Sequence, residues 1–379
     1  MIYLDNSATT KPLPEVMNTF IQVNEQYYAN PSSIHEAGVT ANLLLSKARE
    51  QIAGIINAEP ERVIFTASGT EANNFAIYSV SKTQTHIGKH ILTTNVEHAS
   101  VLEAVNRLKA EGYDVEYLKA NEQGVVTMEE LAKRLRKDTI LVSMMHVNNE
   151  MGAIQPIEEA AKYIHANSRA IFHVDAVQSF GKLPIRFNDE NGPDMLSVSG
   201  HKINGLKGSG FFAFRKKYTI EPLLVGGGQE FGLRSGTVAV PMAVTLAKAA
   251  RLAVEGSEQR FVQYREWNQK LRDLMASFEK DVYVLSTEQG APYIFSFGVK
   301  GLKGEILINA LQKRGVIVST SSACFSKAKK TSHVVKALNV PVPFESGVLR
   351  VSMGALTTAA DIDAFIKAFK EVMTELKGE

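Results

Sequence analysis

Cysteine is nearly absent from this chain of 379 residues, which contains only Cys324. One cysteine cannot form an internal disulfide and cannot supply a multi-cysteine zinc or iron–sulfur site, so we predict no metal centre. Cys324 is therefore either inert buried filler or a reactive thiol. The N-terminus lacks a basic stretch followed by an apolar run, and no segment has the roughly 20 apolar residues of a membrane span. We therefore expect a cytoplasmic protein without membrane contact.

An excess of charge of one sign is also lacking, since 42 Lys and Arg balance 40 Asp and Glu for a net charge of +2. Without a broad basic field, direct binding of nucleic acid is not expected. The hydrophobic content of 45% is typical of globular proteins and sufficient for a full core. The length favours two domains.

Short β-branched runs alternate with longer amphipathic stretches through the first two thirds of the chain. Val16, Phe20, Val23 and Tyr27 repeat at helical spacing, as do apolar residues over 44–55. This alternation predicts an α/β fold, with a mostly parallel sheet, helices on both faces, and sites beyond the carboxyl ends of the strands. The predicted strands are 62–65, 90–94, 115–118, 140–145, 171–175 and 195–198.

The pattern changes after about residue 255, where a long polar helix over 258–280 precedes shorter strand and helix segments. We predict a large domain over 15–255. The smaller α+β domain would comprise 1–14 and 256–379, and it would carry Cys324.

Ser68, Gly69 and Thr70 separate a predicted strand from a predicted helix. Backbone amides at a helix N-terminus bind anions, and glycine lets a phosphate approach closely. The same residues also fit an ordinary capped connection between a strand and a helix. The turn is therefore a candidate phosphate site that needs support from elsewhere in the chain.

Asp175 ends a strongly apolar strand, where a buried carboxylate needs a cationic partner such as a pyridinium nitrogen. Lys202 follows a second apolar strand and precedes a glycine-rich stretch. A buried lysine has a lowered pKa and attacks aldehydes to form a Schiff base. Taken singly, Asp175 also fits a turn-capping residue and Lys202 a solvated lysine. Together with the anion turn, they favour a pyridoxal phosphate site.

These residues lie in motifs that resemble the class V aminotransferase group of pyridoxal phosphate enzymes, and within it the cysteine desulfurases of the NifS and IscS type. The resemblance covers nearly the whole chain in the family's order. Its blocks are YLDNSATT (3–10), NPSSIH (30–35), FTASGTEANN (65–74), the EHAS around His98, HVNNEMGAIQPI (146–157), HVDAVQS (173–179), SGHKINGLKG (199–208), GGGQEFGLRSGT (226–237) and SSACFS (321–326).

The resemblance implies a fold type I pyridoxal phosphate transferase with a seven-stranded type of sheet, and it assigns a role to each candidate residue. Lys202 would hold the cofactor covalently, Asp175 would pair with the ring nitrogen, and His98 would stack on the ring and assist proton transfer. The residues implied to contact other parts of cofactor or substrate are Gln178 (ring hydroxyl), Gly69, Thr70, Ser199 and His201 (phosphate), Thr237 (the phosphate of the partner subunit in a homodimer), Asn149 (cofactor and substrate), and Arg350 (substrate carboxylate).

Some of these residues also have plain structural interpretations. Without the family, His98 reads as a helix-start residue and Arg350 as a charge on an edge strand. His35 and His173 lie in family-like blocks, and we expect both to be structural.

Cys324 decides the implied reaction. Its neighbours are small and polar, which is poor core material, and Lys327, Lys329 and Lys330 would favour the thiolate. The resemblance implies that L-cysteine is converted to L-alanine with a persulfide on Cys324. The loop after Cys324 matches the long-loop subgroup.

The expected acceptor of the sulfur is a second protein. IscS-type members carry a longer tail after the last helix than this chain, which ends at Glu379. A dedicated role such as tRNA thiolation is therefore expected beside iron–sulfur or thiamine pathways, with a tRNA sulfurtransferase or an iron–sulfur scaffold as acceptor. The alternatives are selenocysteine lyase, aminotransferase and kynureninase-type reactions on the same scaffold. A partner-binding protein without catalysis is disfavoured, because it would need neither Lys202 nor Cys324.

Overall fold

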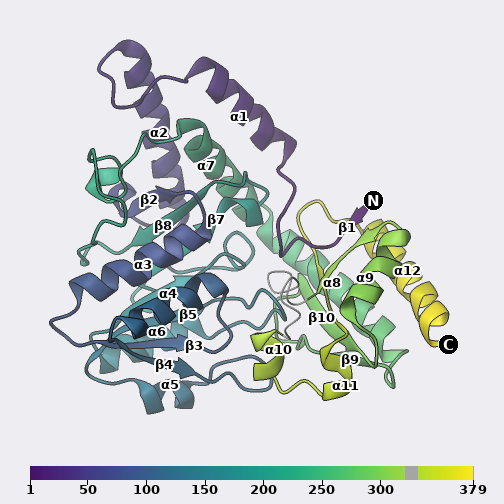
Figure 1. Ribbon diagram of the computed structural model, residues 1–379. Coiled ribbons are helices and arrows are strands. Elements are labelled where there is room, and N and C mark those ends of the chain that lie inside the picture. Colours follow the sequence, from purple (N-terminus) through teal and green to yellow (C-terminus); the bar gives the residue numbers. More distant parts are fainter. Residues whose placement is uncertain (321–331, 379) are drawn as a thin grey trace.

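A computed structural model describes residues 1–320 and 332–378 of the chain. Its strands and helices form a larger body built on one sheet and a smaller body built on another (Figure 1). Within the described residues, no helix combines the length and apolar character that crossing a membrane requires.

The larger body contains a seven-stranded sheet in the order β2-β8-β7-β6-β5-β3-β4. β8 is antiparallel to both of its neighbours, and the remaining contacts between β7, β6, β5, β3 and β4 are parallel. The predicted α/β class with a mostly parallel sheet is therefore confirmed. The strands are β2 (Val63–Thr66), β3 (His90–Thr94), β4 (Asp114–Leu118), β5 (Thr139–Met145), β6 (Ile171–Asp175), β7 (Met195–Ser199) and β8 (Gly210–Phe214).

Helices cover both faces of this sheet, so its central strands are buried on both sides and read as continuous apolar runs. In β6, Phe172 and Val174 face one core and Ile171 faces the other. The first core is completed by α1 (Pro14–Gln26), α2 (Glu36–Ile55), α5 (Met128–Arg134), α6 (Ile157–Asn167) and α7 (Val240–Val254), and the second by α3 (Gly69–Thr83) and α4 (Ala99–Ala110).

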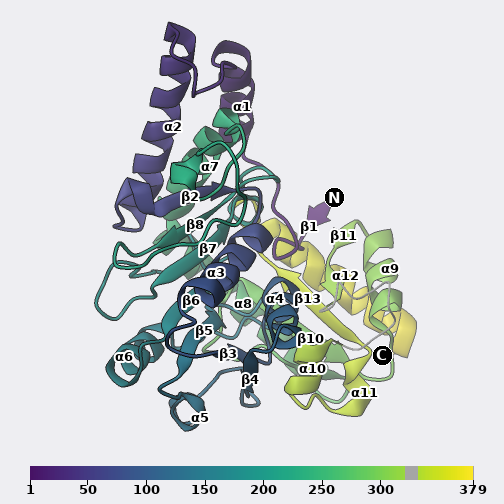
Figure 2. The same ribbon diagram turned by 60° about the vertical axis from the view of Figure 1, so that its left-hand side comes forward.

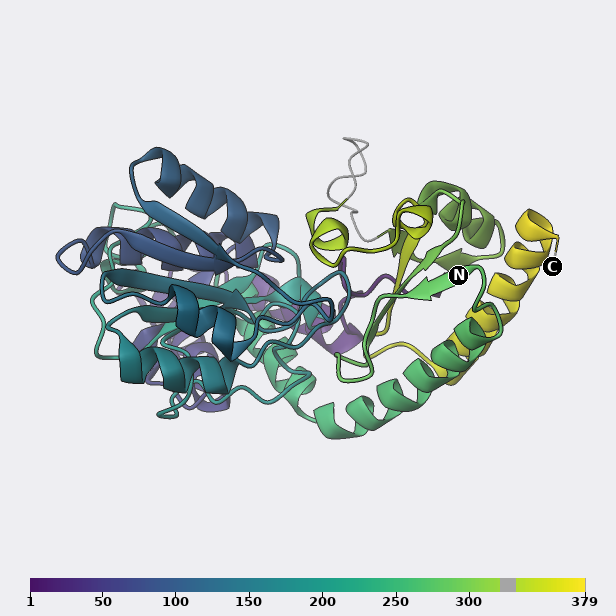
Figure 3. The ribbon, with the colours of Figure 1, turned by 90° about the horizontal axis from the view of Figure 1, so that it is seen from below.

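The smaller body is a four-stranded antiparallel sheet in the order β12-β13-β10-β9, packed against helices of the C-terminal third. The long helix α8 (Ser257–Ala276) runs beneath it and ends beside the last helix (Figure 3). The other elements are β9 (Val282–Val284), β10 (Ile294–Val299), α9 (Gly304–Lys313), β11 (Val316–Ile317), β12 (Ser319–Thr320), α10 (His333–Ala337), α11 (Val342–Glu345), β13 (Val348–Ser352) and α12 (Ala359–Lys377).

The N-terminal strand β1 (Ile2–Tyr3) pairs in parallel with β11 of the smaller body. The chain then passes between the two bodies before α1, and the α1–α2 hairpin projects from the larger one (Figure 2). The domain limits predicted from the sequence, 15–255 against 1–14 with 256–379, stay a prediction.

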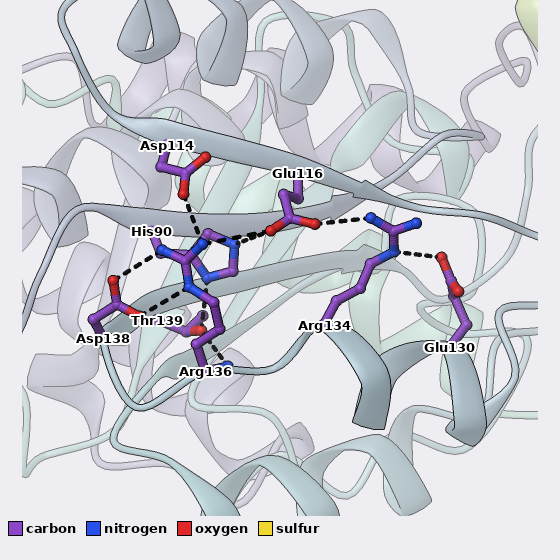
Figure 4. Close-up of polar contacts among 8 residues, drawn as sticks. All are labelled: His90, Asp114, Glu116, Glu130, Arg134, Arg136, Asp138 and Thr139. Carbon is purple, nitrogen blue, oxygen red and sulfur yellow. Dashed lines mark hydrogen bonds and ion pairs between the residues drawn. The ribbon is translucent and has the colours of Figure 1, made fainter.

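The amino ends of β3, β4 and β5 are tied together by ion pairs (Figure 4). Arg136 binds Asp114 at 2.7 Å and Asp138 at 2.8 Å, beside the fully buried His90. Burial, and next the charge of Arg136, lower the pKa of His90. This network lies at the amino ends of the strands. The site is expected at the opposite edge of the sheet, where the strands have their carboxyl ends.

Candidate active site

A cavity of about 280 Å³ lies at the carboxyl ends of β5, β6 and β7 and reaches β13 of the smaller body. It brings together most of the residues predicted from the sequence. Those that line it are Gly69, Thr70, His98, Asn149, Asp175, Gln178, Ser199, His201, Lys202 and Arg350. Thr237 is exposed and lines a separate hollow, and Cys324 lies outside the described residues.

The carboxylate of Asp175 is buried at the end of β6 and held by two donors. The Val177 amide donates to Oδ1 at 2.9 Å, and the Asn73 side chain donates to Oδ2 at 2.7 Å. The turn-capping interpretation of Asp175 holds, since the bond from Val177 closes the following turn, but the residue is buried and does not face the surface. Its carboxylate is fixed where it can meet a cation in the cavity.

His98 is the N-cap of α4, which confirms the helix-start reading, and it also lines the cavity, where its contact with a cofactor ring stays a prediction. Its Nδ1 accepts from the Ser100 amide at 3.1 Å, which places a ring proton on Nε2. Burial is the main cause that lowers the pKa of His98; Asp175 opposes the shift and Lys202 adds to it. The ring is therefore neutral at pH 7 and can stack on a cofactor or exchange a proton.

Lys202 lies in a short 3-10 turn, η2 (Gly200–Lys202), that follows β7. Its Nζ donates to the carbonyl oxygens of Ser7 and Ala8, the latter at 2.8 Å. The Gln178 amide donates to the same Ser7 oxygen at 2.9 Å. The N-terminal LDNSATT segment thus positions Lys202, because its carbonyls hold the amine at the cavity.

The phosphate turn, residues 67–71, connects β2 to α3. The Ser68 side chain caps α3 by accepting from the Glu71 amide at 3.1 Å. A Cβ on Gly69 would lie 2.7 Å from Val177 Cγ2, so only glycine fits there. The capped-connection reading is confirmed, and the same cap leaves helix N-terminal amides at the cavity, so phosphate binding there stays a prediction.

Arg350 enters the cavity from β13 and is buried. Its Nη1 donates to the Asn149 carbonyl at 2.7 Å, its Nη2 pairs with Asp5 at 2.9 Å, and its Nε has no partner among the described residues. The edge-strand interpretation is wrong, because β13 lies between β12 and β10. Arg350 therefore offers a guanidinium to an anionic substrate group at the junction of the two bodies.

Two buried carboxyl groups in the cavity wall were missed from the sequence. Burial raises the pKa of Glu97 to about 8, although its Oε1 accepts from the Met145 amide and the Thr94 hydroxyl, each at 2.8 Å. Burial also raises the pKa of Glu150 to about 7, against a 2.6 Å hydrogen bond from Ser332. Asn73 was missed too. Each lies inside a quoted motif, but only tertiary contacts reveal its role.

The cavity fits pyridoxal phosphate. Gln178 Oε1 is buried without a partner among the described residues, as the acceptor for a ring hydroxyl should be. Gly69 and Thr70 give amides for a phosphate, and Asp175 faces the same space as Lys202. Gly69 and Thr70 would hold the phosphate of the cofactor, Asp175 its ring nitrogen and Lys202 its aldehyde carbon.

Comparison with known proteins shows the family to which the chain belongs. The family described as aminotransferase class-V matches residues 2–365. The chain belongs to that family, among the NifS- and IscS-type cysteine desulfurases. It is 38% identical over 378 residues to "Cysteine desulfurase" from Trichormus azollae, covering all of this chain and 94% of that protein. It is 39% identical over 381 residues to "Cysteine desulfurase IscS" from Dictyoglomus turgidum, covering 99% of this chain and 95% of that protein.

Solved structures show the same relationship. A structure titled "NIFS-LIKE PROTEIN" superposes with a TM-score of 0.93 at 34% identity, covering 99% of this chain and all of that one. The fold and family membership identify this NifS/IscS-type protein as a pyridoxal phosphate-dependent enzyme.

Proposed function

We propose that the protein is a cysteine desulfurase, which converts L-cysteine to L-alanine and leaves a persulfide on Cys324. The observation that carries the proposal is the single cavity shared by Asp175, Lys202 and Arg350. It combines a carboxylate for the cofactor's ring nitrogen, an amine for attachment and proton transfer, and a guanidinium for an amino acid's carboxylate. The names of the relatives support L-cysteine as the substrate.

When bound, pyridoxal phosphate supplies an electron sink for charge that develops at the substrate's Cα. Lys202 removes the Cα proton, and the carbonyls of Ser7 and Ala8 orient its Nζ for this transfer. Arg350 binds the substrate carboxylate beside Asn149.

Sulfur transfer falls to Cys324. Its thiolate attacks the substrate sulfur, so that an S–S bond forms as the C–S bond breaks. The electron pair of the C–S bond stays with the three-carbon fragment, which is protonated and leaves as alanine. Thiol exchange then passes the outer persulfide sulfur to an acceptor protein, for which tRNA thiolation, iron–sulfur and thiamine pathways are the candidates.

We further propose a homodimer in which Thr237 reaches the partner subunit's cofactor. Thr237 is exposed and does not line its own subunit's cavity, and it shares a hollow with Tyr28. Large apolar side chains are exposed on the α1–α2 hairpin, among them Tyr28 at 82% and Ile34 at 98%. Such exposed apolar groups mark association surfaces and support this arrangement.

The test is a single turnover of the holoenzyme with L-cysteine, followed by mass spectrometry of the protein and quantification of alanine. We expect one added sulfur on Cys324 together with stoichiometric alanine. Cys324→Ala should abolish the added sulfur, and Lys202→Ala should abolish both products.

Two results would contradict the proposal. One is alanine release without protein-bound sulfur, which indicates lyase chemistry. The other is a Cys324→Ala variant that forms alanine at the wild-type rate. Separately, alanine release from L-selenocysteine but not from L-cysteine would identify a selenocysteine lyase.

A further inference from the structure

The glycine-rich segment, residues 226–237, approaches the phosphate turn from outside the cavity. Within it, Glu230 and Phe231 are consecutive non-glycine residues in the left-handed region, with φ of 50° and 58°. This conformation is unfavourable for residues with a Cβ, so contacts elsewhere must hold it. The segment ends at Thr237, and its shape sets where Thr237 lies.

A buried ion pair anchors the middle of the segment. Arg49 of α2 binds Glu230 through two nitrogens, at 2.5 and 2.8 Å, and the side chains are only 8% and 1% exposed. The Phe65 amide, in the strand that leads into the phosphate turn, also donates to Glu230 at 2.8 Å. The carboxylate therefore connects the segment to β2 as well as to α2.

A second ion pair anchors the segment three residues before Thr237. Arg234 Nε binds Glu71 of α3 at 2.7 Å, and these side chains are 22% and 16% exposed. Glu71 also accepts from the Ala67 amide at 2.8 Å. Glu71 directly follows Gly69 and Thr70, so the Arg234–Glu71 ion pair is made with the phosphate turn itself.

The two pairs have a common arrangement. In each, one carboxylate accepts from a backbone amide at or beside the phosphate turn and is neutralised by an arginine. An unpaired carboxylate so near an anion site would repel a phosphate and weaken its binding. Arg234 therefore both fixes the segment and cancels the charge of Glu71.

We propose that the Arg49–Glu230 and Glu71–Arg234 ion pairs lock the glycine-rich segment onto the phosphate turn, and that these four side chains are positioning residues for the cofactor's phosphate. This inference rests on the proposed placement of that phosphate at Gly69 and Thr70, with Thr237 reaching the partner subunit's cofactor. None of the four lines the cavity, so each acts through the backbone that it holds.

The test uses Arg234→Met, because the partly exposed pair can be removed with less effect on folding than the buried one. Cofactor is removed and then titrated back, and its dissociation constant is measured from the absorbance change. Arg234→Met should raise the dissociation constant about tenfold, since Glu71 is left unpaired. Glu71→Gln combined with Arg234→Met should recover most of the affinity, because the repelling charge is gone.

Arg134→Met is the matched control. Arg134 binds Glu130 at 2.6 Å with exposures of 23% and 17%, close to those of the tested pair, and also binds Glu116 of β4 at 2.8 Å (Figure 4). β4 lies at the other end of the sheet from β2. It should match Arg234→Met in thermal unfolding of the cofactor-free protein and keep wild-type cofactor affinity.

The inference fails if Arg234→Met binds the cofactor as the control does, or if Glu71→Gln restores nothing. Failure of the proposed function gives a different result, because the wild type itself would then neither bind pyridoxal phosphate nor release alanine from L-cysteine. An equal fall in cofactor affinity in Arg234→Met and Arg134→Met would also overturn the inference, because it would reflect general destabilisation.

Discussion

At the residue scale, Asn73 is the side chain through which α3 supports the carboxylate of Asp175. Its amide donates to Asp175 at 2.7 Å and to the Ser100 hydroxyl at 2.9 Å. Asn73→Ala should lower kcat about tenfold with little change in KM, because a hydrogen bond to a charged group at the reacting centre is lost. Steady-state alanine formation measures this.

Asn74 provides the control for that change. It is the next residue in the same helix, and among the described residues its amide donates only to the backbone carbonyls of Thr70 and Ser100. Asn74→Ala should keep kcat within about twofold of wild type. Equal losses in the two variants would show that the effect comes from α3 as a whole and would refute a specific role for Asn73.

Glu97 gives a prediction for pH. Burial raises its pKa from 4.5 to about 8, so the folded state keeps a proton that the unfolded state loses above pH 4.5. The stability from this proton is fully present below pH 4.5 and declines as the pH rises toward 8. Glu97→Gln keeps a neutral side chain. Its free energy of unfolding relative to wild type should therefore increase by about 3–4 kcal/mol from pH 5 to pH 8.

Urea unfolding of cofactor-free protein at the two pH values measures the difference, with the exposed Glu122→Gln as a control that should show no such change. A constant difference between Glu97→Gln and wild type would mean that the folded state already carries an ionised Glu97.

The two residues recognised by their own local signal are Asp175 and Lys202, each a polar side chain that comes soon after an apolar run. Asp175 and Lys202 both follow buried strands. Asn73 and Glu97 have no such signal, since each lies among polar residues, and only the packing of α3, β3 and β5 shows where they point. Glu230 and Arg49 are 181 positions apart, and nothing in sequence spacing pairs them.

At the element scale, the six predicted strands of the large sheet agree with the structure to within about two residues, because buried parallel strands are continuous apolar runs. β8 was missed. Its sequence GFFAF was taken as part of a glycine-rich exit after Lys202, and a short apolar run carries no period that separates strand from loop. Its antiparallel direction follows from its short connection to β7.

Helix α10 begins directly after Ser332, and these residues contact the wall of the cavity. Ser332 caps this helix through the Val334 amide at 3.1 Å and donates to Glu150 at 2.6 Å, while His333 bonds the Glu97 carbonyl at 2.9 Å. Cys324 lies eight positions before Ser332. Ser332→Ala should slow persulfide formation about fivefold or more, because a cap and a bond to a buried acid are both lost.

In Ser332→Ala, the absorbance change that follows mixing of L-cysteine with the holoenzyme should keep its wild-type rate. In Ser332→Thr, both the absorbance change and persulfide formation should keep their wild-type rates. Stopped-flow absorbance and quenched-flow mass spectrometry separate the two steps. Equal slowing of the absorbance change and of persulfide formation would mean that Ser332 acts on the cofactor site and not on the step that involves Cys324.

At the scale of the whole molecule, the site exists only because distant parts of the chain meet. The N-terminal strand β1 pairs with β11, and Asp5 pairs with Arg350 at 2.9 Å. Asp5 lies in a quoted motif and Arg350 was assigned by the family resemblance, but neither revealed the contact, because a separation of 345 residues leaves no local pattern. The cavity is therefore a property of the folded chain that motif order alone could not locate.

The proposed dimer makes the site a property of two chains, and mixed dimers test this directly. Lys202→Ala and Thr237→Ala chains are co-expressed with different tags, and the mixed dimer, which has one chain of each kind, is purified. If Thr237 serves the partner subunit's cofactor, one site carries both changes and the other site has an intact Lys202 and an intact Thr237. The purified mixed dimer should then have about half of wild-type activity, well above either parent. If Thr237 serves its own subunit, no site in the mixed dimer is intact, and its activity should not exceed the mean of the parents.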